Sequence, residues 1–141
     1  SLVGSEMCIR DSRYPASAIA VRRDAILKAN VTYSLLYGGG AKYSNGEDSL
    51  FLHDCLKKGL RIYADTALLG KEVYRQSTWF SGYHEKFFLD RGVLYHDLYG
   101  CMAKLFSIRF LWSNRKEMLT TINFRTAYGL MKQGIREGKL R

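Results

Sequence analysis

A helix that leads directly into a strand pattern is the feature that most constrains the fold of this chain. From Glu47 onward, apolar side chains recur at helical spacing, and the pattern stops at Gly59 after two lysines. Residues 60–65 then alternate apolar and polar side chains, which is typical of a half-buried strand. The sequence therefore predicts a tight turn from a helix into a strand.

The residues on either side extend this pattern. A short apolar run at 17–22 predicts a buried strand, and 23–30 predicts a short helix that stops at Asn30. Residues 66–73 continue as an extended segment with a bend at Gly70. Strands that alternate with helices predict an α/β fold.

The C-terminal half is predicted to be helical. An aromatic-rich helical pattern covers 83–94, and 95–112 and 116–133 form two amphipathic helices, separated near Ser113 and Asn114. The tail from 134 to 141 is expected to fray. Basic side chains on the polar faces suit either an anionic membrane surface or plain solvation. They are Arg109, Arg115, Lys116 and Arg125.

Composition sets the class of protein and leaves its partner open. The 141 residues suffice for about one domain, and a hydrophobic content of 47% argues against disorder. Lys and Arg number 22 against 13 Asp and Glu, which gives a net charge of +9. This balance suits nucleic acid, an acidic membrane or a phosphorylated substrate, but a solvated basic surface explains it equally well.

Cysteine spacing and hydropathy exclude several kinds of site. The three cysteines form no Cys-x-x-Cys pair, so neither a zinc site nor a disulfide framework is indicated, and a reducing compartment fits best. No run of about 18 apolar residues occurs that would predict a membrane span. Residues 1–12 lack a signal-peptide pattern and resemble a translated sequencing-adaptor scar, so they are left out of the fold prediction.

Two adjacent carboxylates, Glu47 and Asp48, are the strongest candidates for chemistry. They stand at the predicted start of a helix, shortly after a glycine-rich loop at 38–40 and directly after Gly46. One explanation is helix capping together with an ordinary turn. The other is a ligand site, in which the glycines allow a close approach and a carboxylate acts as a general base.

The ordered series of motifs resembles bacterial glycosyltransferase family 2. The resemblance covers about residues 14–95. It rests on Gly-Gly-Gly-Ala-Lys-Tyr-Ser-Asn-Gly-Glu-Asp-Ser-Leu-Phe-Leu at 38–52, Cys-Leu-Lys-Lys-Gly-Leu-Arg-Ile-Tyr at 55–63, and Ser-Thr-Trp-Phe-x-Gly-Tyr-x-Glu-Lys-Phe-Phe-x-Asp-Arg-Gly at 77–92. It implies the C-terminal half of a GT-A fold, a Rossmann-like nucleotide-diphospho-sugar transferase, over 13–94, followed by C-terminal amphipathic helices over 95–141.

The resemblance also assigns roles to residues. Asp48 becomes the catalytic base of an inverting transfer, and Glu47 assists it or orients the acceptor. Substrate-binding residues are implied in the loop before the acids and in the segment after the predicted strand. They are Gly38, Gly39, Gly40, Gly46, Arg75, Gln76 and Trp79.

One family motif is absent from these 141 residues. The Asp-x-Asp pair, which holds Mg²⁺ or Mn²⁺ on the donor diphosphate, does not occur, and we expect no metal ligand among the residues present. We therefore expect this chain to be a fragment that is inactive by itself.

The implied function is that of an inverting glycosyltransferase that uses a nucleotide-diphosphate sugar. It adds the sugar to a polysaccharide or lipid-linked acceptor in cell-envelope glycan synthesis, in the cytoplasm and peripherally at the inner face of the plasma membrane. Nucleic acid is not an expected partner. The alternative is a non-enzymatic basic module that binds nucleic acid or an acidic membrane surface.

Overall fold

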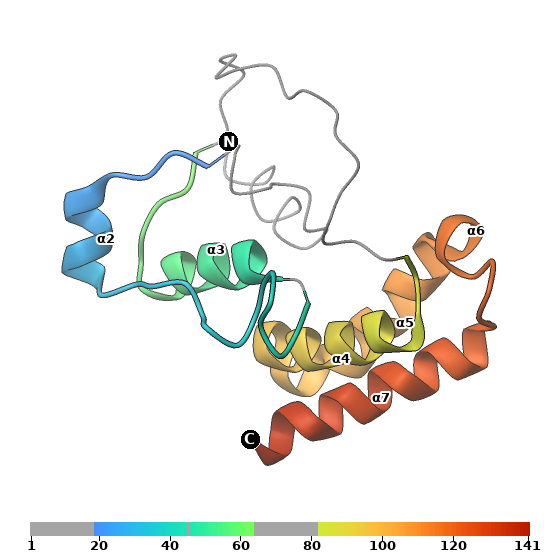
Figure 1. The fold of residues 1–141 in the computed structure, drawn as a ribbon. Coiled ribbons are helices and arrows are strands. Elements are labelled where there is room, and N and C mark those ends of the chain that lie inside the picture. The colour runs from blue at the N-terminus through green and yellow to red at the C-terminus, as the bar shows by residue number, and fades with distance from the viewer. Residues whose placement is uncertain (1–18, 45, 64–81) are drawn as a thin grey trace. The chain divides into compact units, whose positions relative to one another are not determined.

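The chain divides into two compact units, each of which is described by itself. The computed structural model describes residues 19–44, 46–63 and 82–141 (Figure 1). The first unit comprises Ser1–Leu36 and Gly46–Gln76, and the second comprises Tyr37–Asn45 and Ser77–Arg141.

The predicted α/β fold is wrong. The described residues form helices and contain no strand or sheet, apart from an isolated parallel bridge between Tyr37 and Tyr43. The GT-A architecture that the resemblance implied is therefore not the fold of these residues. Of the predicted strands, 64–73 and residues 17 and 18 lie outside the described part of the chain.

The alternation at 60–65 has another physical cause in the part that is described. Leu60 and Ile62 pack against the apolar cluster of the first unit, while Arg61 and Tyr63 face solvent. A strand needs a neighbouring strand to receive its backbone hydrogen bonds, and none is present among the described residues. The alternating pattern thus reflects which side chains pack on a helix. It does not require the hydrogen-bonded ladder of a sheet.

The helices of the first unit begin and end where the sequence predicts. They are α2 (Arg23–Ala29) and α3 (Glu47–Lys57). Asn30 adopts the left-handed conformation with φ 50°, and the Val31 amide donates to the Ile26 carbonyl at 3.3 Å. Gly59 has φ 79°, and the Leu60 amide donates to the Cys55 carbonyl at 2.9 Å. Both helices therefore end in Schellman motifs.

The core of the first unit lies on one face of α3. Phe51, Leu52 and Cys55 are buried together with Val31, which confirms most of the predicted apolar stripe. Burial raises the pKa of the Cys55 thiol, and the nearby Asp54 charge adds to this effect. This thiol is therefore a packing group with little thiolate character.

The second unit is a set of packed helices, of which α4, α5 and α7 lie side by side (Figure 1). The predicted break near Ser113 and Asn114 is confirmed. The prediction that the tail frays is wrong, because the last helix runs on to Leu140 and buries Ile135. The elements are α4 (Glu85–Tyr99), η2 (Gly100–Met102), α5 (Ala103–Ser113), α6 (Arg115–Met118) and α7 (Phe124–Leu140).

Glycines bring the backbones of α4 and α7 into direct contact. A Cβ atom placed on Gly134 would overlap the Leu89 carbonyl oxygen and would lie 2.9 Å from the Val93 amide nitrogen. A Cβ atom on Gly92 would overlap the Met131 carbonyl. The close crossing buries Phe88, Val93, Leu94 and Met131 completely. It is why α7 remains ordered to its end.

We expect Gly134→Ala to destabilise the chain by at least about 2 kcal/mol, because the added methyl group meets backbone atoms that cannot rotate away. The matched control is Gly129→Ala on the same helix, where a Cβ atom would have nothing within 4 Å. That change should be neutral or should stabilise the chain by up to about 1 kcal/mol. Chemical denaturation of both variants measures the difference, and equal stabilities would contradict the close crossing.

Candidate functional site

Glu47 and Asp48 occupy the first turn of α3. The preceding Gly46 has φ 109°, a left-handed conformation that glycine adopts without strain, and its carbonyl accepts from the Leu50 amide at 3.0 Å. Gly46 stands at the N-cap and no side chain caps this helix end. Both acids are half-buried. Their charges are stabilised by the free amide groups and the dipole of the helix start.

Tyr33 makes this helix start into a small polar site. Its ring stacks on Phe51 with centroids 4.3 Å apart and planes inclined by 3°. Burial raises the pKa of the Tyr33 phenol, and the charge of Asp48 and the hydrogen bond to it raise the pKa further, with a smaller contribution from Glu47. The phenol thus stays protonated beside the Asp48 carboxylate.

This arrangement sets what the site can do chemically. The aromatic stack limits the movement of Tyr33 and keeps its phenol near the Asp48 carboxylate. A carboxylate at a helix start is suited to accepting a proton from a hydroxyl group that approaches it. Sequence reasoning missed Tyr33, because its position depends on a ring contact with Phe51 that forms only in the folded chain.

The glycines at 38–40 belong to the second unit, in a loop that closes on itself. The Gly38 amide donates to the Tyr43 carbonyl at 2.9 Å, and the Ala41 amide donates to the Gly38 carbonyl at 3.1 Å. Gly38 and Gly40 have φ 112° and φ 81°, so both need the freedom of glycine. Gly38 is buried, whereas Gly39 and Gly40 are exposed.

Three acidic side chains hold this loop against the helices. Asp90 of α4, which is 1% exposed, accepts from the Ser44 amide at 2.9 Å, from the Ser44 hydroxyl at 2.8 Å and from Lys86 at 2.6 Å. Tyr37 donates to Asp97 at 2.7 Å, and Tyr43 donates to Glu137 of α7 at 2.8 Å. The loop is therefore anchored at both of its ends.

The anchors have altered acidities. Burial of Asp97 opposes its ionisation, but hydrogen bonds from Tyr37, Arg141 and His96 outweigh it and lower the pKa of the carboxyl. The Lys42 ammonium and the Tyr43 hydroxyl lower the pKa of Glu137. Burial and the bond to Asp97 raise the pKa of Tyr37. Each shift favours the protonation state that keeps the loop in place.

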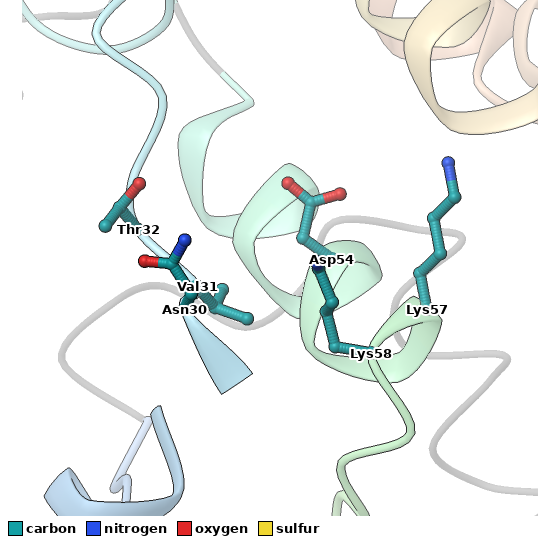
Figure 2. Close-up of a pocket in the computed structure, with 6 residues that line it drawn as sticks. All are labelled: Asn30, Val31, Thr32, Asp54, Lys57 and Lys58. Carbon is teal, nitrogen blue, oxygen red and sulfur yellow. The ribbon is translucent and has the colours of Figure 1, made fainter. Parts of the chain in front are cut away.

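A shallow depression of about 510 Å³ lies at the opposite end of α3 from the acids (Figure 2). Asp54, Lys57 and Lys58 line it from α3, and residues 30–32 line it from the segment after α2. At about 1.5 Å per residue, Asp54 and Lys57 lie roughly 9 Å and 14 Å along α3 from Asp48. It is therefore a separate feature from the Glu47 and Asp48 site.

The structure does not describe the other predicted substrate-binding residues. Arg75, Gln76 and Trp79 lie outside the described residues. Within the parts that the structure describes, no group of three His, Cys, Asp or Glu side chains is placed to hold a metal ion. No helix among the described segments is long and apolar enough to cross a membrane.

No protein-family model matches the chain, and no curated protein or solved structure matches it.

We expect Asp97→Asn to reduce the sensitivity of the chain to acid. Because the folded-state pKa lies below the unfolded value of about 3.9, the Asp97 carboxylate stabilises the folded state above that pH and ceases to do so as the pH falls through the folded pKa. The wild-type free energy of unfolding should therefore fall as the pH drops below about 4, and it should fall less in the variant.

The control for this measurement is Glu85→Gln, which removes an exposed carboxylate from the same helix. Denaturation curves are recorded at a series of pH values for the three proteins. If Asp97→Asn and wild type lose stability in parallel, Asp97 does not anchor the loop as an ion.

Proposed function

We propose that this chain carries the acceptor-side base of an inverting, nucleotide-sugar-dependent glycosyltransferase. The observation that carries the proposal is the Asp48 carboxylate on the first turn of α3, with the Tyr33 phenol beside it. The resemblance of the motif series to glycosyltransferase family 2 supports it. The proposal depends on these residues and this helix start, and it requires no sheet in the described part of the chain.

In the proposed reaction, Asp48 takes the proton from an acceptor hydroxyl. The freed oxygen attacks the anomeric carbon of the donor sugar, a new carbon–oxygen bond forms there, and the bond to the nucleoside diphosphate breaks. Attack from the face opposite the leaving group inverts the configuration. Glu47, one residue earlier on the same turn, binds another hydroxyl of the acceptor and orients it.

The proposed substrates and location follow the resemblance. The donor is a nucleotide-diphosphate sugar, and the acceptor is a polysaccharide or a lipid-linked glycan of the cell envelope. The protein works in the cytoplasm, peripherally at the inner face of the plasma membrane. A requirement for Mg²⁺ or Mn²⁺ on the donor diphosphate stays a prediction that the resemblance implies.

The test of Asp48 is sugar transfer by the full-length protein, with a panel of sugar nucleotides. Asp48→Asn should lower kcat by about 100-fold to 10,000-fold and leave donor binding unchanged, because the amide cannot accept the proton. Asp54→Asn, on the same helix but at its other end, is the matched control. If Asp48→Asn transfers sugar within twofold of the rate of the control, Glu47 and Asp48 serve only as favourable charges at the start of the helix. That result would contradict the proposal.

A second variant tests the role of Tyr33. Tyr33→Phe keeps the ring that stacks on Phe51 and removes the hydroxyl beside Asp48. We expect kcat to fall by about tenfold, with little change in the KM for the donor, since a positioned base is more effective than an unpositioned one. If kcat is unchanged, Tyr33 only packs.

A further inference from the structure

Helix α5 is apolar on two faces, and only one of them is covered. Ala103, Ser107 and Leu111 are buried on the inner face, within the apolar cluster that α4 and α7 share. The Arg91 guanidinium of α4 lies 5.2 Å from the Phe110 ring centroid and helps to fix α5 in this orientation. A helix that is apolar on all sides is normally buried on all sides. The outer face of α5 therefore lacks a counterpart within the unit.

The outer face consists of large apolar side chains at helical spacing. Leu105 is 61% exposed, Ile108 is 41% exposed and Trp112 is 63% exposed. Met102, which directly precedes the helix, is 49% exposed. Positions that are three and four residues apart lie on one side of a helix, so these side chains form one stripe. Single exposed apolar side chains are ordinary, but a continuous stripe marks a binding surface.

The charge around this stripe has one sign. Residues 98–116 contain no Asp or Glu. The same segment contains four exposed basic side chains, which are Lys104, Arg109, Arg115 and Lys116. At the end of the helix, the Arg115 guanidinium lies 4.9 Å from the Trp112 ring centroid and donates to the Trp112 carbonyl at 2.8 Å. The stripe is thus bordered by cations.

This combination favours a lipid surface over the other partners. The core of a protein–protein interface is depleted of charged residues, and such an interface does not need an edge that carries only basic residues. Single-stranded nucleic acid needs aromatic faces for stacking, whereas Met102, Leu105 and Ile108 offer alkyl groups. An interfacial helix buries such alkyl groups at the level of the lipid headgroups, places Trp at the boundary and sets Lys and Arg against anionic phosphates.

We propose that the outer face of α5, formed by Met102, Leu105, Ile108 and Trp112, binds the surface of an anionic lipid bilayer. The bilayer is contacted and not crossed, since the apolar side chains lie along one side of an eleven-residue helix. This inference rests on the peripheral location in the proposed function and assigns the membrane contact to named residues. Its test involves no sugar transfer, so it and the proposed glycosyl transfer fail independently.

The test is flotation of the full chain with two kinds of vesicle, one of pure phosphatidylcholine and one of equal parts phosphatidylcholine and phosphatidylglycerol. We expect binding to the anionic vesicles, with an affinity that falls as salt is added. The double variant Leu105→Gln and Ile108→Gln should bind at least about tenfold more weakly. Its matched control, Leu27→Gln and Leu140→Gln, removes two exposed leucines that lie off α5 and should bind like wild type.

A charge pair provides a second measurement that does not alter the apolar stripe. Lys104→Glu and Arg109→Glu together should weaken binding to the anionic vesicles and reduce its salt dependence. Lys57→Glu and Lys58→Glu make the same change in charge on α3, and this control should bind nearly as well as wild type. Circular dichroism checks that all variants keep their helices, which is expected because every substituted residue is exposed.

Three results would overturn the proposal. The first is equal binding to the neutral and the anionic vesicles, and the second is equal loss in the α5 variants and their controls. The third is a wild-type chain that ignores vesicles but forms a dimer that the Leu105 and Ile108 substitutions dissociate, since the stripe would then be an interface between copies.

Discussion

The close crossing of α4 and α7 is the contact on which the second unit depends. Gly92 and Gly134 remove the side chains that would separate the two helices, so that backbone meets backbone. This crossing fixes where Asp90, Asp97 and Glu137 stand, and these three carboxylates hold the ends of the glycine loop. An ordered loop with three consecutive glycines is costly in entropy. Here the three carboxylate anchors outweigh that cost.

Contacts within the first unit are sufficient to form its polar site. A left-handed Gly46 starts α3 without a side-chain cap, which leaves the first turn to two carboxylates. The Tyr33 ring lies flat on Phe51, and its phenol lies beside Asp48. Stacking and a helix start are enough to bring the phenol and the carboxylate together.

The sequence predicted local structure well where the signal was local. Asn30 and Gly59 end helices because the left-handed conformation suits them, and the α3 stripe reports its buried face directly. The strands failed because alternation states only which side chains are buried, and Leu60 and Ile62 satisfy it by packing on a helix. A sheet depends on partners far away in the chain, and local periodicity carries no information about them.

The candidate site was predictable only in part. The acid pair stood out, but Tyr33 and Asp90 did not, because their roles depend on contacts made after folding. Asn123, whose side chain accepts from the Thr126 amide at 2.8 Å, could have been recognised from the sequence as an N-cap. Gly134 could have been read as a packing residue, since a glycine inside a helical pattern usually has a structural reason.

The central claim is that Asp48 meets the acceptor. The measurement that tests it most directly is a structure of the full-length protein with an acceptor sugar and a nucleoside diphosphate bound. The predicted result is an acceptor hydroxyl within about 2.6–3.2 Å of the Asp48 carboxylate, which is hydrogen-bond reach for a general base. An acceptor bound elsewhere, with Asp48 facing only Tyr33 and the backbone of α3, would contradict it.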